Sequence, residues 1–72
     1  MDTGWNKLAD AIILQAVSDY RKALRILRRM PNRQLAAQYV VETEEFFLSD
    51  WFSQLSEIDP HRLIQRLREE AA

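Results

Sequence analysis

The chain has 72 residues, with no cysteine, one glycine and two prolines. Without cysteine it can form neither a disulfide framework nor a thiolate metal site, which fits a reducing compartment. A single glycine cannot build a glycine-rich phosphate-binding loop. The longest apolar run, residues 11–14, is too short to cross a membrane, and the N-terminal MDTGWNKLAD lacks the apolar core of a signal peptide. We therefore expect a cytoplasmic protein with no membrane partner.

Histidine is equally scarce, because His61 is the only one in the chain. It directly follows Pro60, at the expected start of a helix, where a histidine is normally solvated. The proline also breaks the helical spacing that would bring Glu57 and His61 together as metal ligands, and a carboxylate bundle would need two Glu-x-x-His motifs. Catalysis would need several positioned groups in one pocket. We predict no enzyme activity and no catalytic, cofactor or metal site.

Alternating apolar patterns are absent, whereas Ala, Leu, Arg, Glu and Gln are common. This composition predicts an all-α fold. Its length allows one domain, residues 1–72, which we expect to be a small antiparallel bundle of three main helices plus a short fourth. Such a small domain is only marginally stable on its own.

Prolines and capping residues predict where the helices end. Pro31 should end a first helix at about residues 6–30, and Asn32 is a good N-cap for a second helix at about 33–48. Ser49 should cap a short helix at about 50–56. Asp59 followed by a proline predicts the last helix, at about 60–70.

Apolar residues at helical spacing predict the core. The segment EEFFLSDWFSQL, residues 44–55, holds four of the seven aromatic residues, and we interpret this cluster mainly as core. A partner anchor is the alternative, and Phe47 and Leu48 are the first candidates in the cluster for a residue left outside the core. The predicted core residues are Trp5, Leu8, Ala9, Ile12, Ile13, Ala16, Val17, Tyr20, Ala23, Leu24, Leu27, Met30, Leu35, Ala36, Tyr39, Val40, Phe46, Phe47, Trp51, Phe52, Leu55, Leu63, Ile64 and Leu67.

The near-neutral net charge of −1 hides an asymmetry. Residues 1–33 carry seven Lys or Arg and three Asp, whereas residues 34–72 carry three Arg and eight Asp or Glu. The two halves could neutralise each other within the molecule or present charged surfaces to a partner. The candidate partner-binding residues are Arg21, Lys22, Arg25, Arg28 and Arg29 on the first helix and Glu42, Glu44 and Glu45 on the second.

Two alternatives to protein binding remain open. A small DNA-binding regulator could use the basic face of the first helix. It could instead use a helix-turn-helix-like C-terminal pair that presents His61, Arg62, Gln65 and Arg66, although that turn lacks glycine and Glu69 and Glu70 would face phosphates. A self-associating structural protein, a homo-oligomer, is suggested by Leu14 and Val41, which lie off the core-facing stripes.

The segments LADAIILQAVSDYRKALRIL and EEFFLSDWFSQLSEIDPHRLIQRLREE together cover most of the chain. They resemble small, uncharacterised helical proteins encoded by phages and integrative elements of gut Firmicutes. The resemblance rests on FF-x-S-x-W-F-x-x-L and LI-x-x-LR-x-E, and Asp59-Pro60 stands where that family has an Asp-Gly turn. It implies no catalytic residues. It implies a protein-binding accessory of a phage or mobile element, such as an inhibitor of a host defence system.

Overall fold

The computed structural model describes the backbone of residues 3–71 and the side chains of residues 7–71, so the predicted core position of Trp5 lies outside the described side chains. The described chain is all-α, as predicted. Its helices are α1 (Thr3–Arg29), α2 (Gln34–Phe47), α3 (Asp50–Leu55) and α4 (Pro60–Ala71). The predicted helix ends agree with these bounds to within three residues.

The turn between α1 and α2 forms around Pro31, which has no N–H and disfavours helical geometry at Met30. The Arg33 N–H donates to the Met30 carbonyl at 3.1 Å and closes the turn. This bond places Arg33 at the N-cap position of α2, where its side chain makes no capping hydrogen bond. The predicted cap at Asn32 is therefore wrong, because α2 begins one residue too late for it.

The predicted caps of the last two helices are confirmed. Ser49 Oγ accepts the Phe52 N–H at 3.2 Å and donates to the Phe46 carbonyl at 2.6 Å, so one hydroxyl serves the end of α2 and the start of α3. Asp59 Oδ1 accepts the His61 N–H at 3.0 Å at the start of α4. Each such cap contributes about 1 kcal/mol.

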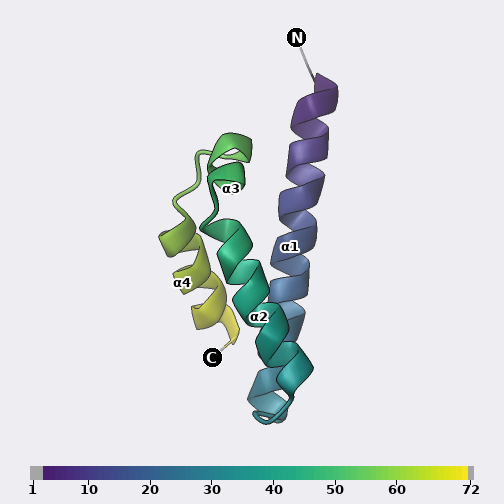
Figure 1. Cartoon of the computed structure of the whole chain (residues 1–72), viewed down its shortest axis with the longest axis vertical. Coiled ribbons are helices and arrows are strands. Elements are labelled where there is room, and N and C mark those ends of the chain that lie inside the picture. Colours follow the sequence, from purple (N-terminus) through teal and green to yellow (C-terminus); the bar gives the residue numbers. More distant parts are fainter. Residues whose placement is uncertain (1–2, 72) are drawn as a thin grey trace.

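The helices form an elongated bundle of 46 × 19 × 19 Å. As Figure 1 shows, α2 runs antiparallel to α1 beside its C-terminal half, and α4 runs parallel to α1 on one side of the pair. α1 packs against α2 and α4, and α2 packs against α3 and α4. The N-terminal end of α1 extends beyond the other helices (Figure 1).

The core is centred on three fully buried aromatic side chains, one from each of the first three helices: Tyr20, Phe47 and Phe52. The Phe47 ring meets the Tyr20 ring edge-on at a centroid distance of 5.7 Å and the Phe52 ring at 5.5 Å. Such edge-to-face pairs add about 0.5–1.5 kcal/mol each beyond the burial of their area. The prediction that aromatics from two helices share one core is confirmed.

Within the aromatic cluster, the predicted core position of Phe47 is confirmed, since it is 0% exposed, and of the two first candidates for exposure only Leu48, at 49%, is exposed. The prediction for Trp51 is wrong, because this residue was expected in the core and is 54% exposed. The Ser49 cap fixes α3 so that Phe52 faces the core, and its neighbour Trp51 then points about 100° away around the helix. The indole keeps one edge-on contact, with Phe46 at 6.1 Å.

Four other predicted core residues are exposed: Leu8, Met30, Leu35 and Tyr39. Leu35 and Tyr39 line a depression between α1 and α2 with Asp19 and Ile26. Tyr39 and Asp19 are bonded to each other, whereas Arg21 on another side of α1 is bonded to α4. The prediction assumed that other helices cover the whole apolar stripe. In the structure α4 covers one flank of the α1–α2 pair, so apolar residues on the other flank stay exposed.

Candidate functional site

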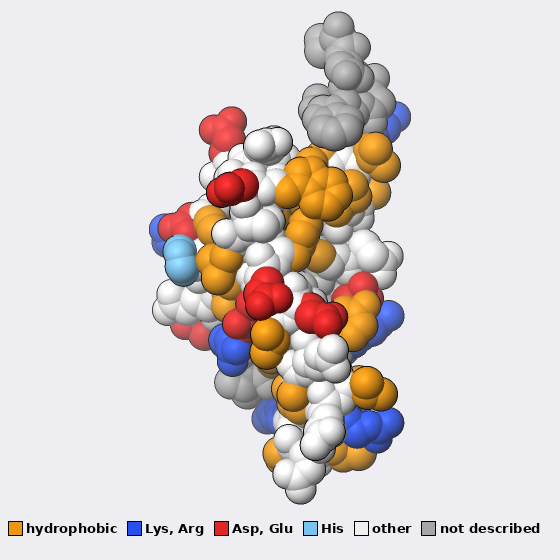
Figure 2. All heavy atoms as spheres, in the orientation of Figure 1, with side chains coloured by type: hydrophobic (Ala, Val, Ile, Leu, Met, Phe, Trp, Pro, Cys, Tyr) orange, Lys and Arg blue, Asp and Glu red, His pale blue; other side chains and the backbone are white. Residues whose placement is uncertain are grey.

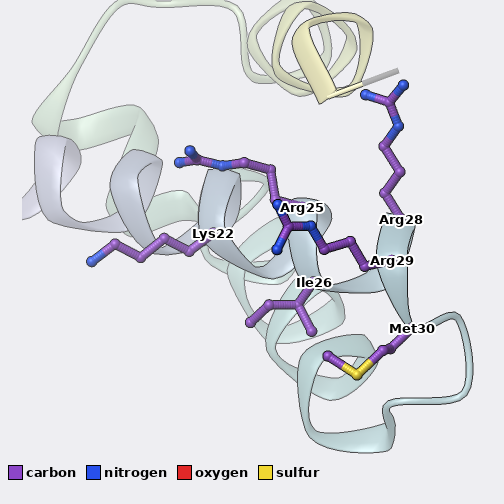
Figure 3. A pocket seen from close by; sticks show the side chains of 6 residues that line it. All are labelled: Lys22, Arg25, Ile26, Arg28, Arg29 and Met30. Atoms are coloured by element: carbon purple, nitrogen blue, oxygen red, sulfur yellow. The ribbon is translucent and has the colours of Figure 1, made fainter.

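Exposed cations gather at the C-terminal end of α1, which we call the basic end: Lys22, Arg25, Arg28 and Arg29, with Ile26 and Met30 between them. Figure 3 shows these six side chains around a shallow open depression, with Arg28 extending toward α4 and Lys22 pointing away from it. Helical spacing produces this arrangement. Positions 22, 25, 26 and 29 follow the i, i+3, i+4, i+7 pattern of one helix face.

Some of the predicted basic residues contact α4 rather than solvent alone. Arg21 Nε lies 2.9 Å from Glu70 Oε1, and Arg28 Nη1 donates to the Ala71 carbonyl at 3.0 Å. These contacts join the basic and acidic halves of the chain within one molecule. In the described part of the chain, Lys22 and Arg29 form no ion pair.

The α1 helix dipole supplies a structural role for part of this charge. The last carbonyls of a helix carry partial negative charge, and cations in the last turn stabilise it by about 0.3–1 kcal/mol each. Arg28 and Arg29 occupy that turn. Lys22 and Arg25 lie farther from the helix end, where the effect fades, so helix stability does not account for them.

Two of the predicted acidic residues are exposed and the third is partly buried. Glu42 and Glu45 are exposed, and Glu42 accepts a hydrogen bond from Gln38 at 3.1 Å. Glu44 instead faces the bundle, where Oε2 accepts the Tyr20 hydroxyl at 2.5 Å and Arg68 Nε at 3.1 Å. The three residues therefore do not present one continuous acidic surface.

The Tyr20–Glu44–Arg68 network links α1, α2 and α4. Burial, followed by the hydrogen bond to the Glu44 carboxylate, raises the pKa of the Tyr20 hydroxyl. The hydrogen bond to Glu44 also raises the pKa of Arg68. The sequence does not predict this network, because its members lie on three helices and no local spacing relates them. The bond to Glu44 satisfies the hydroxyl of the buried Tyr20, so we assign the network to stability.

A second basic group lies between α1 and α4. Arg62 and Arg66 of α4 line a groove together with Arg21 of α1, and Asp59 and Glu70 lie at the same groove. The sequence offered the first-helix face and the C-terminal helix as separate DNA-binding surfaces. The structure brings residues of both surfaces to one side of the molecule.

The described residues contain no group of three or more His, Asp or Glu side chains arranged to hold a metal ion. Across the described helices, none has both the length and the apolar character needed to span a bilayer. No protein-family model matches the chain, and searches of curated proteins and of solved structures give no match either.

Proposed function

We propose that the chain is a non-enzymatic, cytoplasmic binding protein whose basic end docks on an acidic protein partner. One observation carries the proposal: Lys22, Arg25 and Arg29 are exposed beside two exposed apolar side chains. These are Ile26, which is 39% exposed, and Met30, which is 46% exposed. Apolar side chains rimmed by charged ones are the pattern found at protein-interaction sites.

The mixture of side chains favours a protein over a nucleic acid at this end. Arginine and methionine are enriched at protein interfaces, where apolar contacts supply affinity and charges select the partner and speed its approach. Phosphate binding would need the cations alone. The expected partner therefore carries carboxylates around an apolar side chain that contacts Ile26 and Met30.

The resemblance to proteins of phages and integrative elements supports a more specific role. Small proteins of such elements often act by binding, so we propose an accessory protein that inhibits a host defence system. The basic end supports this role better than phosphate mimicry by the acidic residues does. Glu44 is bonded within the bundle, which leaves Glu42 and Glu45 as the exposed pair.

Capture from host lysate with an immobilised chain tests the proposal. We expect the double variant Lys22→Glu, Arg29→Glu to lose an acidic protein that the unchanged chain retains. Both side chains are exposed and unpaired among the described residues, so the variant should fold. Lys7→Glu is the matched control, because Lys7 is an exposed cation at the other end of α1.

The control should capture the same protein as the unchanged chain. Raised salt should weaken that capture, because exposed charges are screened beyond about 10 Å at 0.1 M salt. Undiminished capture by the double variant would show that the partner binds elsewhere.

A small DNA-binding regulator is the second candidate, favoured by Arg62 and Arg66 lying beside Arg21. Phosphate contacts make affinity fall steeply with salt, with a slope that counts the contacts. We expect Arg62→Glu, Arg66→Glu to reduce both affinity for duplex DNA and that slope if this function holds. Absence of salt-sensitive binding by the unchanged chain would eliminate it.

A further inference from the structure

The exposed side of α2 carries a stripe of side chains that the bundle leaves uncovered. Leu35, Gln38, Tyr39 and Glu42 follow the i, i+3, i+4, i+7 spacing and are all exposed; we call them the α2 stripe. Leu35 is 76% exposed and Tyr39 is 50% exposed. Both line the depression between α1 and α2, so the stripe borders a groove with an apolar floor.

The balance of buried and exposed apolar side chains points to a missing layer. Among the described residues, ten hydrophobic residues are buried, and ten large hydrophobic residues are exposed. Figure 2 shows such side chains at the surface over α1 and α2, between acidic and basic ones. Domains of this size without disulfides or metals are commonly stabilised by association of subunits. A second copy of the chain would supply the missing layer.

The charges beside the α2 stripe fit a second copy of the same chain. Arg33, the N-cap residue, lines the depression with Leu35 and Tyr39, and Glu42 lies at the other end of the stripe; both are exposed, and along the sequence they are equally far from the midpoint of Ala37 and Gln38. A two-fold axis through that point would place Arg33 of each copy opposite Glu42 of the other. Self-complementarity of this kind is the requirement for a symmetric dimer.

We propose that two copies of the chain associate through this face, with α2 packed antiparallel on α2 of the second copy. Leu35 of each copy lies beside Tyr39 of the other, and the two Arg33–Glu42 pairs close the ends. A standard stable interface buries about 800 Å² per partner, which is roughly one seventh of the 5609 Å² surface of this chain.

The interface adjoins the basic end, because Lys22 and Ile26 also line the depression beside the α2 stripe, whereas Arg25, Arg28 and Arg29 lie outside it. It differs from the self-association suggested by Leu14 and Val41. Both of those side chains are exposed, but neither belongs to the stripe.

Sedimentation equilibrium tests the dimer first. We expect the mass to rise from 8.5 kDa toward twice that value as the concentration increases from about 1 μM to about 1 mM, the range of weak dissociation constants. Leu35→Ser should abolish this rise in mass with concentration. Val41→Ser, at an exposed apolar position of the same helix outside the stripe, should leave it unchanged. Circular dichroism verifies that both variants are helical.

Charge exchange tests the antiparallel pairing. Glu42→Arg alone and Arg33→Glu alone each create two repulsive pairs and should weaken their own dimers roughly tenfold. A mixture of the two variants restores both attractive pairs, so we expect heterodimers by native mass spectrometry. The double variant should dimerise like the unchanged chain.

Two results would overturn the proposal. One is a mass of 8.5 kDa at every concentration, which is also the result expected if the face is reserved for a foreign helix. The other is a mixture of Glu42→Arg and Arg33→Glu that forms no more heterodimer than either variant forms homodimer.

Discussion

Replacing Phe47 with alanine should remove a large fraction of the stability of the domain. The ring is fully buried and contacts the rings of Tyr20, Phe46 and Phe52, so its loss leaves a cavity between three helices. Buried Phe→Ala changes cost about 3–5 kcal/mol. At about 0.05–0.15 kcal/mol per residue, the total stability of a 72-residue domain is roughly 4–11 kcal/mol.

Trp51→Ala is the matched comparison, because Trp51 belongs to the same cluster but, among the described side chains, has one aromatic contact. Its side chain is half exposed, so we expect a cost of about 1 kcal/mol. Urea unfolding followed by circular dichroism measures both free energies of unfolding. In a domain of this size, each 1 kcal/mol lowers the Tm by about 4–8 °C, so the two variants should differ by about 10 °C or more.

Phe47→Ala alone could fail to fold, and Phe47→Leu therefore completes the series. Leucine fills most of the cavity, so this variant should fold with a loss of about 1–2 kcal/mol. Equal losses for Trp51→Ala and Phe47→Ala would contradict the rotational setting of α3. A larger loss of stability for Trp51→Ala than for Phe47→Leu would also contradict that setting of α3.

Two further predictions concern polar groups. Since the pKa of Tyr20 is raised in the folded chain, its contribution to stability should be complete below pH 10.0, the ordinary pKa, and should be lost as the pH rises further. Tyr20→Phe should make unfolding less sensitive to alkali in urea titrations at pH 9 to 11, roughly the titration range of tyrosine, and an unchanged slope would refute the assignment. Ser49→Ala should cost about 1 kcal/mol through loss of the α3 cap, whereas Ser53→Ala, at an exposed hydroxyl, should cost less than half as much. Similar losses for both serines would show that the cap is unimportant.

The sequence predicts the helices well because local chemistry sets their ends. Pro31 cannot continue α1, and the side chains of Ser49 and Asp59 bond the first N–H groups of the helices that follow them. These signals act within a few residues. The prediction of Asn32 as a cap is wrong because a backbone hydrogen bond closes the turn, and capping preferences describe only side-chain bonds.

Burial within a helix is less predictable, because it depends on which flanks other helices cover. Leu35 and Tyr39 have the periodicity of core residues but lie at an uncovered edge. Thr43 is polar yet buried, since its hydroxyl donates to the Tyr39 carbonyl at 2.7 Å and so leaves no unpaired donor. Glu44 was predicted as a surface charge, and only the placement of α1 and α4 shows its partners, the buried Tyr20 and the exposed Arg68.

The position of Glu44 along the chain has a consequence for folding. It is 24 residues from Tyr20 and 24 residues from Arg68, so the chain entropy lost in closing the two loops is equal. The two loops differ in the segment of chain that connects the bonded residues. A short turn leads from α1 into α2, whereas α3 and a second turn must be ordered before α4 can reach the carboxylate. The α1–α2 hairpin should therefore form first, and α4 should be the first helix to detach when the domain opens, taking Arg68 with it and leaving Tyr20 bonded to Glu44.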